Sequence, residues 1–153
     1  MSMLNCIELF AGIGGIRAGL EAAGFKCLMA IDNDPDAVAI HKLAFGDCIL
    51  KDIFAVDYNK LPKTDLVAGG FPCQPFSSSG TRAGLKHSDG NAFQAVINTL
   101  EAVRPKYVFL ENVRGLLSTQ CGYAMSSVLS SLTALGYTVE WLLINSLWFG
   151  VPQ

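Results

Sequence analysis

Short apolar runs alternate with amphipathic stretches along this chain, and most of the runs end near glycine, proline or a carboxylate. Such runs are typical of buried strands, whereas apolar residues spaced three and four apart predict helices between them. Strands are expected at 4–10, 26–31, 65–68, 106–110 and 138–145, and helices at 15–23, 35–44, 93–103 and 123–135. This alternation predicts an α/β fold with an open, mostly parallel sheet and helices on both faces.

The carboxyl ends of the predicted strands carry the residues that suggest chemistry. Ligands bind at this edge of parallel sheets. A glycine-rich turn follows the first strand, Cys73 follows the strand at 65–68, and Glu111 follows the strand at 106–110. By contrast, Asp34 and Asp36 are expected to cap and charge the start of the helix at 35–44.

Composition favours one folded domain over all 153 residues, because 51% of them are hydrophobic and 16% are charged. A net charge of −2 gives no overall basic footprint for binding a polyanion, although a local basic edge stays open. The N-terminus lacks the pattern of a signal peptide, and the apolar runs fall short of the ~18 residues that span a membrane. We therefore expect a cytoplasmic protein.

The cysteines are odd in number, and none of them forms a C-x-x-C pair. This favours neither a disulfide framework nor a metal site, and Cys6, Cys27 and Cys48 are expected in the core. Cys73 differs because it lies between Pro72 and Pro75, which restrict the backbone on both sides. Such restriction suits a nucleophile that must meet one substrate atom along one line.

The turn Phe10-Ala11-Gly12-Ile13-Gly14-Gly15 could expose backbone amides to a ligand, or it could be a tight turn without one. Asp32, which ends the next strand, is placed to accept from ribose hydroxyls. The spacing G-x-G-G is not that of a pyrophosphate-binding turn, so a nucleoside without phosphates, such as S-adenosylmethionine, fits better. Asp52 could meet the adenine amine or could be a solvated loop carboxylate.

Cys73 and Glu111 together suggest chemistry on cytosine. Thiolate addition at C6 turns C5 into a carbon nucleophile that can take a methyl group. A carboxyl group kept protonated by desolvation would stabilise charge at N3. For Glu111, a helix-capping or surface role is the alternative.

These stretches resemble the C5-cytosine-specific DNA methyltransferase family. The matching segments follow the family's order over nearly the whole chain, namely 9–15, 30–34, 51–53, 70–80, 111–113 and 145–153. The resemblance implies a Rossmann-like, S-adenosylmethionine-dependent methyltransferase sheet. It also implies double-stranded DNA as the partner, from which the target base is flipped out.

Residue roles follow from the same resemblance, position by position. Cys73 would be the nucleophile and Glu111 the acid at N3. The implied cofactor-binding residues are Phe10, Ala11, Gly12, Ile13, Gly14, Asp32, Asn33, Asp52, Ile53 and Pro72. The implied substrate-binding residues are Gln74, Ser77, Ser79 and Asn112.

The sequence departs from the family pattern in two places. Ala92 stands where the family often has a leucine near the adenine. The chain also stops at Gln153, where the family continues into a further strand and a recognition domain. We therefore expect a sheet incomplete at its C-terminal side, with either a gap in the sheet or an exposed apolar edge. The catalytic domain over 1–153 would then be partial, either as a fragment or as one subunit of a split enzyme completed by a second polypeptide.

Three alternatives stay open. A tRNA-directed branch of the family shares the Pro-Cys and Glu-Asn-Val blocks. A cofactor-binding module that has lost activity would keep the glycine turn without catalysis. A nicotinamide oxidoreductase is weakened by the glycine spacing and gives Cys73 no role.

Overall fold

The computed structural model describes residues 3–72 and 92–151. The chain divides into two compact units, Met1–Asn112 and Val113–Gln153. The first unit contains the whole sheet, and the second contains one α-helix and several short 3-10 helices. Within the described residues, no helix is both long and apolar enough to cross a bilayer.

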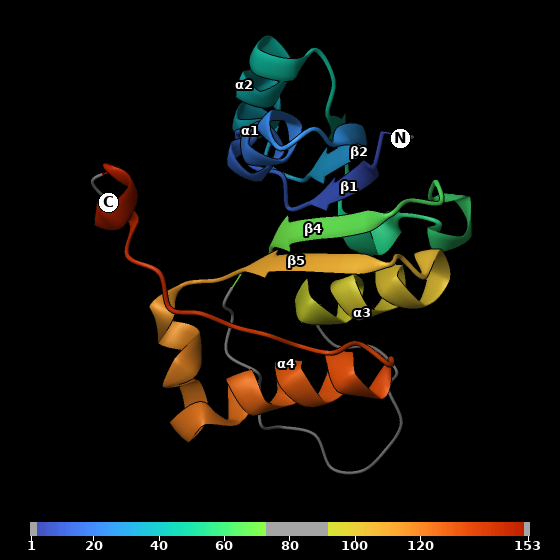
Figure 1. The fold of residues 1–153 in the computed structure, drawn as a ribbon. Coiled ribbons are helices and arrows are strands. Elements are labelled where there is room, and N and C mark those ends of the chain that lie inside the picture. The colour runs from blue at the N-terminus through green and yellow to red at the C-terminus, as the bar shows by residue number, and fades with distance from the viewer. Residues whose placement is uncertain (1–2, 73–91, 152–153) are drawn as a thin grey trace. The chain divides into compact units, whose positions relative to one another are not determined.

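The first unit is built on a five-stranded sheet with the strand order β3-β2-β1-β4-β5 (Figure 1). Every pairing is parallel, which confirms the predicted α/β class. The chain starts in the middle of the sheet, adds β2 and β3 on one side, and then crosses to the other side for β4 and β5. The strands are β1 (Asn5–Leu9), β2 (Lys26–Asp32), β3 (Ile49–Leu50), β4 (Leu66–Gly70) and β5 (Tyr107–Glu111).

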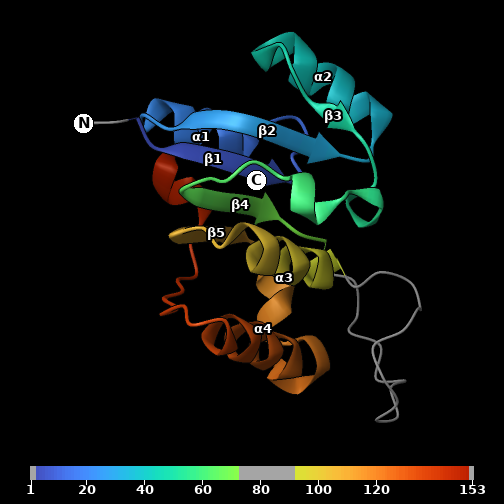
Figure 2. The ribbon, with the colours of Figure 1, turned by 90° about the vertical axis from the view of Figure 1, so that its right-hand side faces the viewer.

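Helices lie on both faces of this sheet, as the alternation predicts. α1 (Gly15–Ala22) and α3 (Ala92–Val103) lie on opposite faces (Figure 2). α2 (Pro35–Phe45) packs against β2 and β3. Its start is capped as predicted, because the Asp34 carboxylate accepts from the backbone N–H groups of Asp36 at 2.9 Å and Ala37 at 3.3 Å.

The core is built around the central strands β1 and β4, which are buried at nearly every position. Ile7 and Leu9 of β1 are fully buried, as is Val67 of β4. The three cysteines expected in the core, Cys6, Cys27 and Cys48, are buried and free. Both faces of a central parallel strand are covered, so its side chains are apolar at nearly every position.

The second unit is organised by α4 (Tyr123–Ala134), whose buried residues Ala124, Val128 and Leu132 recur every four positions on one face. The strand predicted at 138–145 is wrong, since that segment carries no strand in the structure. A strand needs a paired neighbour, and the described sheet ends at β5. The apolar side chains that suggested this strand, Trp141 and Leu142 among them, are exposed.

The predicted apolar edge is present on β5. Tyr107 and Phe109 of this outermost strand are 45% and 50% exposed.

The two-residue strand β3 was not predicted from the sequence. It is too short to produce a periodic pattern and is defined by its pairing with Ile31 and Asp32.

Candidate active site

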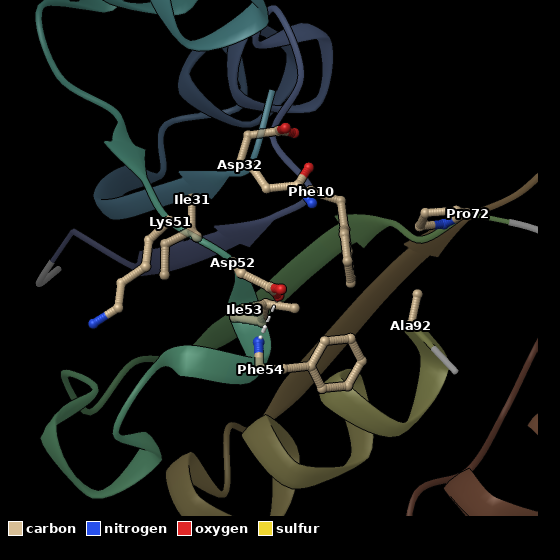
Figure 3. A pocket seen from close by; sticks show the side chains of 10 residues that line it. Phe10, Ile31, Asp32, Lys51, Asp52, Ile53, Phe54, Pro72 and Ala92 are labelled. Carbon is tan, nitrogen blue, oxygen red and sulfur yellow. Dashed lines mark hydrogen bonds between the residues drawn. The ribbon is translucent and has the colours of Figure 1, made fainter. Parts of the chain in front are cut away.

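A pocket opens at the carboxyl ends of the strands, where the sequence places the ligand (Figure 3). The cavity has a volume of about 170 Å³. A single water needs a cavity of roughly 10–15 Å³, so there is room for a ligand of many atoms. The lining side chains are Phe10, Ile31, Asp32, Asn33, Lys51, Asp52, Ile53, Phe54, Pro72 and Ala92.

Phe10 enters the pocket from the end of β1. Its φ of +54° lies in the left-handed region, which is uncommon for a residue with a side chain. Backbone strain of this kind clusters at functional sites, where the surrounding fold holds it in place. The predicted role of Phe10 at a ligand therefore agrees with its position.

Asp32 ends β2 and is tied to the glycine-rich turn. Its Oδ2 accepts the N–H of Gly12 at 2.7 Å, and its Oδ1 accepts the N–H of Asp34 at 2.9 Å. Each carboxylate oxygen has two acceptor positions, so both oxygens can still accept from a ligand hydroxyl. The two backbone bonds fix the orientation of the carboxylate before any ligand arrives.

The turn itself contributes less of the lining than the sequence suggests. Among its predicted members, Ala11, Gly12, Ile13 and Gly14 do not line the pocket. Besides the bond from Gly12 to Asp32, the Gly14 N–H donates to the Ala11 carbonyl at 2.9 Å. These two amides are thus used within the protein.

Asp52 and Ile53 form the third predicted part of the site. Asp52 caps the 3-10 helix η1 (Ile53–Ala55), and its Oδ1 accepts the N–H of Phe54 at 3.0 Å (Figure 3). The carboxylate is exposed toward the pocket, and Ile53 is buried beneath it. The capping bond therefore holds one oxygen of Asp52 and leaves the other for a ligand.

The far side of the pocket is held by β4 and β5. Pro72 lines it directly. The preceding residue, Phe71, is buried, and its carbonyl accepts Nδ2–H of Asn112 at 2.7 Å. Asn112, predicted to contact substrate, thus anchors the backbone just before Pro72.

Glu111 stands at the carboxyl end of β5, level with Gly70 of β4. Its Oε2 is so close to Gly70 that a Cβ added there would lie 3.0 Å away. The side chain is exposed and does not line the pocket, so the described residues do not enclose this carboxyl group. The other predicted residues of this region, Cys73, Gln74, Ser77 and Ser79, lie outside the described residues.

Several residues of the pocket lining were not predicted from the sequence. Ile31, Lys51 and Phe54 line the pocket beside predicted members, and adjacency to those members was the available signal. In Figure 3 the Lys51 ammonium points away from the other lining residues. Ala92, which replaces the leucine that the family often has near the adenine, also lines the pocket.

Glu8, on β1 behind the glycine turn, is the other residue that was missed. It is 1% exposed, and its Oε1 accepts the N–H of Arg17 at 3.1 Å. Its Oε2 has no hydrogen-bond partner among the described residues. Burial raises the pKa of Glu8 to about 7, against the smaller lowering by the Arg17 backbone N–H. A lone acid inside an apolar strand was the signal.

Comparison with known proteins agrees with this arrangement. The family model for C-5 cytosine-specific DNA methylases matches residues 4–153, which include every residue of the pocket lining. The chain belongs to this family. Its glycine-rich turn, pocket and Glu111 strand end are therefore parts of a C5 methylase fold, and the resemblance seen in the sequence is confirmed.

Curated relatives are Type II methyltransferases. M.BsuFI of Bacillus subtilis is 39% identical over 98% of this chain and 37% of its own length. M.NgoBI of Neisseria gonorrhoeae is 38% identical over 99% of this chain and 48% of its own length. The chain thus spans about a third to a half of the relatives it matches.

A solved structure of the Dnmt2 methyltransferase of S. pombe is also similar to this C5 methylase chain. It matches with a TM-score of 0.65 and 29% identity, covering 83% of this chain and 41% of that one. The sheet and the helices of this chain therefore agree with a methyltransferase structure.

Proposed function

We propose that this chain is the catalytic, cofactor-binding part of a DNA (cytosine-5) methyltransferase that uses S-adenosylmethionine. The observation that best supports this function is the pocket at the carboxyl ends of the strands. It combines Phe10, Asp32 and Asp52 with Pro72, the residue before Cys73, in a chain of the C5 methylase family.

The chemistry of the pocket supports S-adenosylmethionine over a phosphate-bearing nucleotide. Asp32 offers acceptors for ribose hydroxyls, and Asp52 offers one for the adenine amine. The amides of Gly12 and Gly14, which would otherwise be available to a phosphate, are bonded within the protein. Two carboxylates in the lining also favour a ligand that carries a positive sulfonium over one that carries negative charge.

In the proposed reaction, the Cys73 thiolate forms a bond to C6 of cytosine, and the ring electrons move toward C5 and N3. Glu111, as a protonated carboxyl group, donates to N3 and stabilises the charge that develops there. When bound, S-adenosylmethionine supplies the methyl group that C5 takes. A base then removes the C5 proton, the C5–C6 double bond re-forms, and Cys73 leaves with its electron pair.

Substrate contacts are proposed for Gln74, Ser77 and Ser79, and Asn112 is proposed to hold the backbone at Phe71 as well as to face the base. Because the chain spans only part of its relatives, we propose that duplex DNA recognition needs a further segment or a complementary polypeptide. Little or no turnover is expected from these 153 residues alone. Acting on DNA, the enzyme would work in the cytoplasm.

Cofactor binding by the chain itself is the first test. Isothermal titration with S-adenosylmethionine should show one site, and Asp32→Ala should weaken it. Asp57→Ala, which changes a carboxylate outside the pocket, should leave binding unchanged. Equal affinity for the Asp32 variant and the wild type would contradict the assignment of the pocket.

Catalysis is tested on a chimaera that adds the remaining length of M.BsuFI to this chain. A duplex containing 5-fluorocytosine should trap a covalent adduct in the presence of S-adenosylmethionine, because fluorine at C5 blocks release of the cysteine. Cys73→Ala should abolish the adduct. An unchanged adduct would show that Cys73 is not the nucleophile, and trapping on tRNA in preference to DNA would identify the tRNA-directed alternative.

A further inference from the structure

A buried histidine lies behind the glycine-rich turn and has no part in the chemistry described so far. His41, on α2, is fully buried. Its Nδ1 lies 3.3 Å from the carbonyl oxygen of Gly12, and its Nε2 lies 3.4 Å from Nη1 of Arg17. The ring therefore joins the turn to a buried guanidinium.

The chemistry of the two partners fixes the state of the ring. A carbonyl oxygen only accepts hydrogen bonds, and a guanidinium only donates them. His41 must therefore carry its proton on Nδ1, donate it to Gly12, and accept at Nε2 from Arg17. This is the neutral imidazole with one defined tautomer.

Arg17 is itself held in place, so it can orient the ring. Its guanidinium pairs with Glu21 at 2.8 Å and with Asp47 at 2.8 Å, and it lies 4.8 Å from the ring centroid of Phe45. Burial lowers the pKa of Arg17, but the hydrogen bonds that Arg17 donates to Glu21 and Asp47 raise it by more, and the net direction is upward. Nη1 of Arg17 also contacts Oδ1 of Asp47 at 2.8 Å and donates to the Asp47 carbonyl oxygen at 3.1 Å, so its contact with His41 at 3.4 Å is the longest of the three. The charged guanidinium offers no acceptor, so His41 can only accept from it.

Gly12 is consequently held through both of its backbone groups. Its carbonyl faces His41, while its N–H donates to the Asp32 carboxylate in the pocket. Its φ of +53° lies in the left-handed region, which glycine adopts at no steric cost. A shift of the Gly12 carbonyl therefore also moves the Gly12 N–H, which is bonded to the Asp32 carboxylate in the pocket.

We propose that His41 is a positioning residue for cofactor binding, acting through the Gly12 carbonyl to set the orientation of Asp32. This rests on the proposed function, because it takes the pocket as the S-adenosylmethionine site. The hydrogen bond to Gly12 carries the effect, and the bond from Arg17 selects the tautomer that can make it.

Two variants distinguish the hydrogen bond at Nδ1 of His41 from the hydrogen bond at Nε2. In His41→Asn the amide nitrogen takes the place of Nδ1 and can still donate to Gly12. In His41→Gln the amide lies one carbon further out, near Nε2, and can still accept from Arg17. Val38→Ala is the matched control, because it shortens a buried side chain on the same helix that makes no hydrogen bond to the turn.

Affinity for S-adenosylmethionine is measured by isothermal titration on the 153-residue chain, at a temperature where every variant is folded by circular dichroism. His41→Gln should weaken binding about three- to ten-fold, as expected for one lost hydrogen bond. His41→Asn should bind nearly as well as the wild type. Val38→Ala should lower the Tm and leave affinity unchanged. Equal losses for Asn and Gln, or an equal loss for the control, would overturn the proposal.

Two readouts do not depend on cofactor binding. Amide hydrogen exchange at residues 10–15 should be faster in His41→Gln than in His41→Asn. In the wild type, ¹⁵N chemical shifts of the ring should show the proton on Nδ1, and a proton on Nε2 would refute the inference even if the variants fail to fold. If the wild type binds no S-adenosylmethionine, the proposed function fails, and the exchange comparison alone decides whether His41 positions the turn.

Discussion

Asn112 donates its side-chain Nδ2–H to the carbonyl oxygen of Phe71 at 2.7 Å, across 41 residues of sequence. The bond joins the residue after β5 to the residue after β4, at the edge of the sheet where the pocket lies. Phe71 is further fixed by its ring, whose centroid lies 5.2 Å from that of Phe93 on α3. The backbone that leads to Pro72 and Cys73 therefore starts from a well-held position.

Removing this amide should destabilise the first unit. Asn112→Ala is expected to lower the free energy of unfolding by about 1 kcal/mol, because the half-buried carbonyl of Phe71 loses its donor. Urea unfolding followed by circular dichroism measures the change. Asn59→Ala, on the exposed helix η2 (Tyr58–Lys60), is the control and should change stability by much less. Equal values would show that the bond contributes nothing measurable.

Two glycines of the same segment should respond to alanine with opposite signs. Gly14 has a φ of +96°, and a Cβ there would overlap the Phe45 ring and come within 3.2 Å of Nδ1 of His41. Gly14→Ala should cost more than about 1 kcal/mol of stability. Gly19 lies within α1 with open space around it, so Gly19→Ala should add roughly 0.5–1 kcal/mol. Thermal and urea unfolding of both variants would show the contrast, and a shared sign would contradict it.

Glu8 should make stability depend on pH. Its folded pKa is raised to about 7 from an unfolded value of 4.5, mainly because burial disfavours the carboxylate. Between these values the folded state binds the proton more tightly, so its contribution is complete below pH 4.5 and is lost as pH rises through 7. A shift of this size corresponds to roughly 3 kcal/mol.

Glu8→Gln keeps the size of the side chain and cannot ionise. As pH rises from 4.5 to above 7, the wild type should therefore lose stability relative to Glu8→Gln, and the difference in their unfolding free energies should change by that amount. Urea unfolding across this range measures it, with Glu101→Gln on the exposed part of α3 as the control. A difference that does not vary with pH would show that Glu8 titrates as it does in the unfolded chain.

The cap of α2 offers a test of local structure. Asp34 accepts from two backbone N–H groups, whereas Asp36 contributes charge in the first turn. Asp34→Ala should cost about 1 kcal/mol of stability. Asp36→Ala should cost about 0.3–1 kcal/mol at low ionic strength and less in salt. If the two variants lose the same stability at high salt, the capping bonds are not what distinguishes them.

The elements that the sequence predicted correctly are those whose burial follows a simple period. β1 and β4 are buried on both faces, so they read as apolar runs, and the alternation with helices was enough to predict a parallel sheet. Residues 138–145 show the limit of this reasoning. Their apolar pattern resembles that of a buried strand, but pairing is a property of the neighbours and is not encoded in the segment itself.

In the candidate site, too, some features could be predicted from the sequence and others could not. Phe10 and Asp32 could be predicted because each lies at the end of a predicted strand and all strand ends meet at one edge, whereas the role of Asp52 rested mainly on the resemblance to the family. The bond from Gly12 to Asp32 could not be predicted, since it turns an amide away from the ligand through a local choice of φ and ψ. Nor could the position of His41, because a histidine in a helix gives no signal of what its buried ring will meet.

The pocket is assembled from short segments spread between residues 10 and 92 of the chain. Parallel pairing brings these segments together only after long loops have closed, and such topologies fold slowly. The pocket therefore exists only when these strands have paired, and it is lost when the sheet opens. A ligand bound there would slow unfolding and raise the Tm with its concentration, so that the lifetime of the folded chain would follow the supply of its own cofactor.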